Sequence, residues 1–196
     1  IRDFDATRSV DLMTAEKTGL AYRPPAQRVA FTFRHLLSQI QIIGRIDPAL
    51  AASGVSATIR SVKLYGMPGT GECAVQPEGN GTWSLGEATD ADNPFARDTV
   101  SRELTPAGIS VFADDLLLFP QQVGDGFVLE IEYEYAGNGT SGTFAKSISL
   151  AGAGIGTWEA GCSYRYTFTV GNEYILFEKP EVIPWSSASG GNITVE

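Results

Sequence analysis

The sequence predicts an all-β protein, an antiparallel β-sandwich with at most short helices, on three observations. Turn signals recur along the chain, as expected from 22 glycines and 10 prolines among 196 residues. Short runs rich in β-branched and aromatic residues lie between these turns. One run, at 127–135, alternates between apolar and charged residues, a period that fits a strand and that a helix would scatter around its surface.

The run at 127–135 predicts a half-buried strand, with its apolar face turned inward and its glutamates in water. We expect the three glutamates to form a solvated face, since nothing in the sequence indicates a cleft that would pair them for glycoside hydrolysis. The apolar face consists of Leu129, Ile131, Tyr133 and Tyr135, and the other face of Val128, Glu130, Glu132 and Glu134.

The same pattern predicts the remaining strands, with Gly171-Asn172 as the turn of a hairpin because both residues tolerate positive φ. Asp47 as N-cap, Pro48 at the first position and Gly54 at the end predict one or two turns of helix. The acidic stretch 86–98 has no periodicity and is expected to be a loop. The predicted strands are 28–33, 38–43 as its continuation or as a separate strand, 58–65, 116–119, 143–150, 164–170, 173–177 and 193–196.

Net charge is −9, and it is concentrated in the middle of the chain: eleven acidic and two basic residues lie between Glu87 and Glu134. No dense basic patch accompanies aromatic residues, so a nucleic-acid partner is not expected. No apolar run is long enough to span a membrane. The 43% content of hydrophobic residues is sufficient for a folded core. The charge indicates a surface that stays in water rather than a charged ligand.

Enzymatic chemistry is not expected, because nothing resembles a nucleophile elbow, a metal motif or a phosphate loop. The chain has one histidine, His35, and two cysteines, Cys73 and Cys162. Two cysteines are too few for a disulfide scaffold, although one bridge between them is open. We expect no catalytic residue, no cofactor and no metal site, and a structural, hydrogen-bonded role for His35. For the acidic loop around Asp90 we expect solvation rather than calcium binding.

Residues 1–26 are polar and end in Tyr22-Arg-Pro-Pro, which stiffens the chain into an extended connector. We interpret 1–26 as the tail of an N-terminal domain or a linker, and 27–196 as a C-terminal β-sandwich domain. Because the chain begins at Ile1 without a signal stretch, we expect it to be processed, proteolysed or trimmed.

Three motifs follow one another along the chain. The first is Asp11-Leu-Met-Thr-Ala15 followed by Val29-Ala-Phe-Thr-Phe-Arg-His35-Leu-Leu-Ser-Gln-Ile40. The second is an apolar run from Leu116 that ends in Pro120-Gln121-Gln122. The third is Trp158-Glu-Ala-Gly161-Cys-Ser-Tyr164-Arg-Tyr166, followed by Ile175 and Trp185. In this order they resemble the fimbrillin-like family of Bacteroidetes, which includes type V pilins and related surface lipoproteins. Cys162 departs from the pattern, because the family often has Lys there.

This resemblance implies an extracellular β-sandwich of transthyretin-like topology, located at the cell surface in a fimbrium or attached to the outer membrane. It implies a structural subunit, or an accessory or anchor component, of a fimbria with a role in adhesion. The partners would be other fimbrial subunits, with host or bacterial surface ligands. The alternative function is a surface glycan-binding module of an exported lipoprotein.

Four residues are candidate functional sites. Ile193 and Val195 lie on one face of a short C-terminal strand after the flexible Gly190-Gly191, and this strand either closes its own sheet or is donated to a neighbour. Thr99, in Asp98-Thr99-Val100, resembles an O-glycosylation acceptor of exported Bacteroidetes proteins. Trp83, in a glycine-rich region, is the candidate platform for a sugar ring, whereas Trp158 and Trp185 are expected to be core or hairpin anchors.

Overall fold

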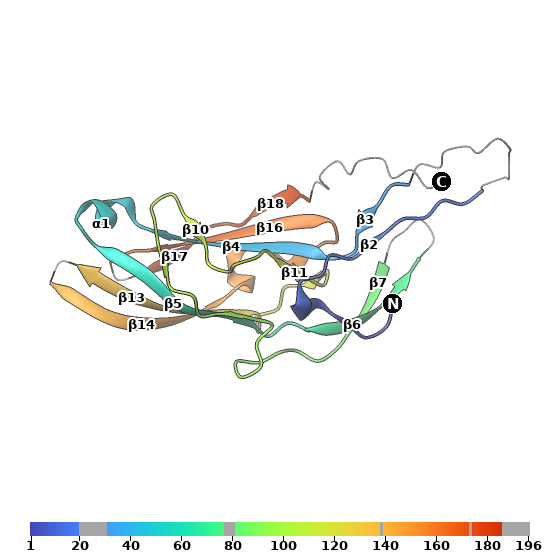
Figure 1. Cartoon of the computed structure of the whole chain (residues 1–196), viewed down its shortest axis with the longest axis horizontal. Helices are drawn as coiled ribbons and strands as arrows, with labels where there is room; N and C mark the ends of the chain where they lie inside the picture. The colour runs from blue at the N-terminus through green and yellow to red at the C-terminus, as the bar shows by residue number, and fades with distance from the viewer. Residues whose placement is uncertain (20–30, 77–80, 138, 173, 186–196) are drawn as a thin grey trace.

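Two β-layers face each other in the computed structural model, with a smaller sheet at one end (Figure 1). The structure describes residues 1–19, 31–76, 81–137, 139–172 and 174–185. The elements are β1 (Phe4–Asp5), η1 (Ala6–Arg8), β2 (Met13–Thr14), β3 (Arg34–His35), β4 (Ser38–Ile46), α1 (Pro48–Ala52), β5 (Ser56–Tyr65), β6 (Thr70–Val75), β7 (Gly81–Leu85), β8 (Ala96–Asp98), β9 (Arg102–Glu103), β10 (Ile109–Ser110), β11 (Leu116–Leu118), β12 (Gln121–Gln122), β13 (Val128–Gly137), β14 (Thr140–Ser149), η2 (Ala151–Ala153), β15 (Thr157–Trp158), β16 (Cys162–Val170), β17 (Ile175–Phe177) and β18 (Glu181–Pro184).

The prediction of an all-β fold is confirmed. One layer has the strand order β10-β4-β16-β17, with β11 also on β4 and β18 also on β16. The other has the order β14-β13-β5-β8, with β9 also on β5, and the smaller sheet has the order β1-β6-β7. The central pair β4–β16 is parallel, while the other described pairs of named strands are antiparallel. Strand alternation predicts which face is buried but not which strand lies alongside, so the sequence could not reveal this parallel pair.

The predicted apolar face of β13 forms the centre of the core. Leu129 and Ile131 have no exposed surface, and Tyr133 and Tyr135 are buried with them. Burial of such side chains is the main favourable term in folding. Position 44 of β4 leaves no room for a side chain, because a Cβ there would lie 2.8 Å from side-chain atoms of both Leu104 and Phe168.

Most of the other predicted elements are present. Strands β5, β11, β14 and β16 cover the predicted runs, and β17 returns antiparallel on β16 after the predicted Gly171-Asn172 turn. Helix α1 begins after Asp47, whose carboxylate accepts a hydrogen bond of 2.8 Å from the Ala49 N–H. The predicted loop 86–98 ends in the short strand β8. The last predicted strand, 193–196, lies outside the described residues.

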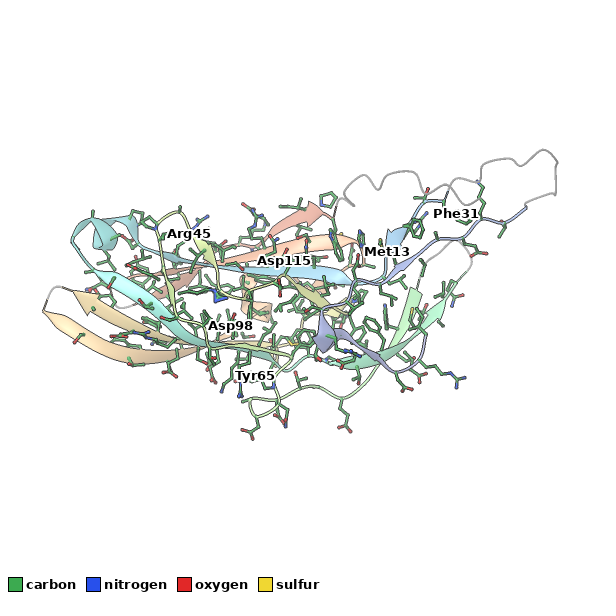
Figure 2. All side chains as sticks on the ribbon, viewed as in Figure 1. Met13, Phe31, Arg45, Tyr65, Asp98 and Asp115 are labelled. Atoms are coloured by element: carbon green, nitrogen blue, oxygen red, sulfur yellow. The ribbon has the colours of Figure 1, made fainter. Side chains whose placement is uncertain are left out.

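The prediction of a core strand at 28–33 is wrong for its described part. Residues 31–33 are not in a strand, and Phe31 and Phe33 are 51% and 54% exposed. Figure 2 shows Phe31 on the extension that projects from the body. Among the described strands, the next strand, β3, pairs only with β2. Periodicity records which residues share a face, but burial also needs a layer to cover that face.

Residues at the N-terminus pair with the smaller sheet. Phe4 lies opposite Gly71 in the β1–β6 pair, and the Ala6 N–H donates to the Gly69 carbonyl at 2.9 Å. Ala6 has no exposed surface. Residues 20–30 lie outside the described part of the chain, so the boundary at residue 26 stays a prediction.

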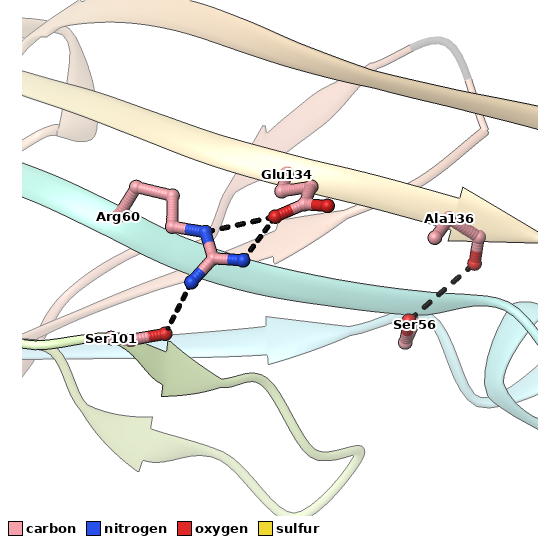
Figure 3. A network of polar contacts seen from close by, with 5 residues as sticks. All are labelled: Ser56, Arg60, Ser101, Glu134 and Ala136. Carbon is pink, nitrogen blue, oxygen red and sulfur yellow. Dashed lines mark hydrogen bonds and ion pairs between the residues drawn. The ribbon is translucent and has the colours of Figure 1, made fainter.

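The outer face of β5 and β13 is hydrophilic, as the three glutamates predicted, and two of them form ion pairs. Glu130 lies 2.9 Å from the Lys63 ammonium, and Glu134 accepts hydrogen bonds from the Arg60 guanidinium. The same guanidinium donates to Ser101 Oγ at 2.8 Å (Figure 3). Arg60 is the extra residue of a β-bulge, because Glu132 pairs with Ser61 and Tyr133 with Ile59.

Candidate functional site

Three segments far apart in the sequence, each carrying one of the motifs, meet around Trp158. The indole of Trp158 has no exposed surface, and its Nε1–H donates to the Tyr166 hydroxyl at 2.9 Å. Gln121 of the second motif lies opposite Trp158 in the β12–β15 pair. A buried indole normally has a hydrogen-bond partner, which the tyrosine supplies from the same motif. The expectation that Trp158 is a core anchor is therefore confirmed.

The turn between β15 and β16 is held by hydrogen bonds from several segments of the chain. The Tyr164 hydroxyl accepts from the Glu159 N–H at 2.7 Å, and Ser38 Oγ donates to the Glu159 carbonyl at 2.9 Å. The Gly161 N–H donates to the Leu37 carbonyl at 2.9 Å, and the Gly161 carbonyl accepts from the backbone N–H of Trp185 at 3.0 Å. These contacts join the first motif to the third, so the motifs mark a structural junction.

His35 connects three segments at the edge of this junction. Its Nδ1 lies 3.0 Å from an Asp11 carboxylate oxygen, and its ring stacks on Trp185 with centroids 3.8 Å apart and planes 13° apart. Among the described residues, His35 Nε2 has no hydrogen-bond partner. The expected structural role of His35 is confirmed by these contacts, which hold the segments of Asp11 and Trp185 against β3.

Burial governs the ionisation of the phenols in the junction. It raises the pKa of Tyr166 to about 12, while the hydrogen bond from Trp158 lowers it by less. Burial also raises the pKa of Tyr164, against a lowering by the Glu159 N–H. Because both phenols stay protonated and hydrogen-bonded at neutral pH, they have the properties of structural groups rather than of a general base.

Trp83 lies apart from the junction, in β7. Its Nε1–H donates to the Leu36 carbonyl at 3.0 Å, and its ring packs against Phe119 and Phe4 with centroid distances of 4.6 and 5.7 Å. The side chain is half-buried. Its contacts attach the small sheet to the main core, and the platform role stays a prediction.

Thr99 lies in the exposed loop between β8 and β9. The Asp98 carboxylate accepts from the Val100 N–H at 2.8 Å and from the Arg102 guanidinium at 2.8 Å. Thr99 is exposed at the top of this turn and Val100 is 61% exposed. An acceptor hydroxyl must be accessible to be modified, which this position satisfies, and modification itself stays a prediction.

The carboxylate of Asp90 accepts hydrogen bonds from the backbone of its own loop. It accepts hydrogen bonds from the N–H groups of Asp92 and Asn93 at 2.9 and 2.8 Å. In the described part of the chain, no group of three or more His, Cys, Asp or Glu side chains is arranged to hold a metal ion. Cys73 and Cys162 are both free thiols, so the disulfide that the sequence left open is not formed.

The residues of the predicted strand-donor tail, Ile193 and Val195, lie outside the described residues. The structure does show a feature that the sequence does not predict, the open edge of strand β14. The ten residues of β14 pair with β13 on one side, and no described strand pairs with the other side. Alternation in 143–150 predicted the strand, but edge position depends on sheet order and leaves no local signal.

The chain is similar to one protein family and to solved structures of known proteins. The model of the family described as fimbrillin-like matches residues 5–185. A candidate cell adhesion protein of Bacteroides uniformis shares the fold at 18% identity and a TM-score of 0.57, over 94% of this chain and 66% of that one. A candidate cell adhesion protein of Parabacteroides distasonis gives 12% identity and a TM-score of 0.53, over 81% of this chain and 55% of that one.

The chain thus spans less than two thirds of the length of each of these two structures. No match is found among curated proteins. In the part of the chain that the structure describes, no helix has both the length and the apolar character needed to cross a membrane.

Proposed function

Because the chain belongs to the fimbrillin-like family, we propose that it is a structural subunit, or an accessory or anchor component, of a fimbria at the cell surface. The match over residues 5–185 carries this proposal. The junction around Trp158 supports it, since the motif residues serve packing and hydrogen bonding rather than catalysis. Adhesion at the outer surface of the cell, as part of an exported lipoprotein assembly, is the corresponding biological role.

Assembly would proceed by β-strand addition, in which an extended segment pairs with an open edge and places alternate side chains in pockets. The donor in this proposal is the C-terminal tail, with Ile193 and Val195 as the inserted residues. Subunits that exchange strands gain backbone hydrogen bonds along the whole segment, which suits a fibre that must resist force.

Deletion of residues 190–196 tests the donor role. We expect the deleted chain to fold, with an unchanged thermal unfolding midpoint, and to form no polymer by electron microscopy or sedimentation. Unfolding on deletion would mean instead that the tail closes its own sheet.

A matched pair of point variants sharpens this test. Ile193→Asp places a charge on the face that enters the acceptor and should abolish polymerisation, whereas Thr194→Asp places the same charge on the opposite face and should not. Equal loss in both variants would contradict the donor role.

The alternative, a glycan-binding module, rests on Trp83. A sugar platform requires an open aromatic face, and the ring of Trp83 instead packs on Phe119 and Phe4. Retained binding to a glycan array in Trp83→Ala would exclude this residue as the platform.

A further inference from the structure

Strand β14 is the longest open edge in the described part of the chain. It runs for ten residues, from Thr140 to Ser149, and pairs with β13 in ten consecutive positions without a bulge. It contains no proline, and its residues from Ser141 to Ser149 are exposed except for the partly buried Gly142 and Ile148. An exposed row of backbone N–H and C=O groups of this length is a template for another strand.

The other edges of the two layers are interrupted. Strands β8, β9 and β10 have two or three residues each. On the opposite side, β17 ends three residues before Pro180 and β18 ends in Pro184, and proline removes a backbone donor. Natural proteins protect sheet edges with short strands and prolines, and β14 has neither form of protection.

The side chains of β14 form two simple rows. The row facing the sandwich interior contains Phe144, which is 42% exposed although its ring lies 5.7 Å from that of Tyr133. Lys146 is the single charged residue of the strand. An edge lysine ordinarily discourages pairing, because pairing would leave its charge without a partner. The interior row is Gly142, Phe144, Lys146 and Ile148, and the outer row is Ser141, Thr143, Ala145, Ser147 and Ser149.

We propose that β14 is a lateral interface at which two copies of this chain pair their β14 strands antiparallel, around a two-fold axis at Ala145. In that register, a residue that lies n positions before Ala145 in one copy is opposite the residue that lies n positions after Ala145 in the other copy. Phe144 of each copy then lies opposite Lys146 of the other, so the ammonium group meets an aromatic face instead of a second ammonium.

The rest of the register is equally self-complementary. Gly142 lies opposite Ile148, which gives the large side chain room, and Thr143 lies opposite Ser147 on the outer face. Hydroxyl pairs across strands stabilise a sheet, while like charges directly opposite destabilise it. No acidic residue lies on β14, so Lys146 has no competing partner within the strand. A second copy is therefore the occupant that this edge fits.

Two variants at position 144, with opposite charges, test the proposed contact with Lys146 of the second copy. Phe144→Lys places lysine opposite lysine and should weaken dimerisation about tenfold or more, measured by sedimentation equilibrium on the full chain. Phe144→Glu removes the same ring but places a carboxylate opposite Lys146, and should dimerise at least as well as the parent. If repulsion between the net charges governed dimerisation, Phe144→Lys would dimerise better than Phe144→Glu, because the parent chain already carries a net charge of −9. Equal loss in both variants, or a monomeric parent up to millimolar concentration, would overturn the proposal.

Cysteine cross-linking tests the register. In a Cys162→Ser background, Ala145→Cys should form a disulfide dimer on mild oxidation, because position 145 lies opposite itself. Ser141→Cys alone is the matched control and should not cross-link, whereas Ser141→Cys with Ser149→Cys should.

The tail deletion separates this interface from the donor proposal. A chain lacking residues 190–196 should still dimerise and cross-link through β14. Loss of dimerisation on tail deletion, with no effect of the Phe144 variants, would identify the donated tail as the occupant of an edge and overturn the pairing of β14 strands.

Discussion

At the scale of single residues, buried polar groups with dedicated partners give this protein its organisation. The Trp158 indole and the Tyr166 hydroxyl are both fully buried and satisfy each other at 2.9 Å. The free energy of such a pair lies mainly in avoiding an unpaired buried group. The sequence predicted that Trp158 is an anchor, but not that Tyr166 is its partner, since strands with many aromatics offer several candidates.

The hydroxyl of Tyr166 makes stability depend on pH in alkaline solution. Its pKa is about 12 in the folded chain and about 10 in an unfolded one, so between these values only the unfolded chain has lost the proton. The stabilisation that this difference in pKa gives to the folded chain is fully present below about pH 10 and is lost as pH rises to about 12. In Tyr166→Phe we expect a shallower fall of the unfolding free energy over this range, measured by denaturant titration.

The same variant leaves the Trp158 Nε1–H without its acceptor, which should cost about 1–3 kcal/mol at neutral pH. Tyr174→Phe, at a 52% exposed position, is the matched control for loss of a phenol. An alkaline slope equal to that of the parent in Tyr166→Phe would contradict the assignment.

At the scale of elements, the bulge in β5 shows how tertiary structure modifies a sequence pattern. Simple alternation from Val62 and Leu64 back to residue 58 would direct Arg60 into the core. The bulge adds one residue, so Ile59 takes the inner position and Arg60 turns outward to Glu134. Burying an unpaired guanidinium would cost far more than one lost ladder hydrogen bond, which is the physical reason for the bulge.

Two ion pairs on this layer should contribute differently to the free energy of unfolding. Arg60 and Glu134 are 45% and 43% exposed, whereas Arg102 and Asp98 are 19% and 11% exposed. Arg60→Ala should lower the unfolding free energy by less than about 1 kcal/mol. Arg102→Ala should lower it by about 2 kcal/mol, because a partly buried carboxylate loses its counter-charge. Chemical denaturation at low and high salt measures both, and equal costs would contradict the burial argument.

At the scale of the whole molecule, segments far apart in sequence close the structure. β1 joins the small sheet, and Phe4 reaches the rings of Trp83 and Phe119. Its polar composition and the two prolines that follow it predicted a segment outside the main domain. Polarity describes most of its residues, while a single aromatic ring is enough to attach it.

Phe4→Ala tests whether the first residues belong to the same cooperative unit. We expect one unfolding transition, shifted to lower stability by about 2 kcal/mol through loss of the ring contacts. Calorimetry of the full chain measures this, and Val10→Ala, at a 54% exposed position, is the control. An unchanged transition would support an independent N-terminal tail.

By itself the sequence determined the all-β class, the buried face of β13, the short helix after Asp47 and the motifs that place the chain in its family. These features depend on local period, capping and residue order, which are written along the chain. Only the tertiary structure decided the parallel β4–β16 pair, the bulge at Arg60, the exposure of Phe31 and Phe33, and the open edge of β14. Each of these depends on which element lies beside or above another, and such non-local contacts leave no periodic trace in the sequence.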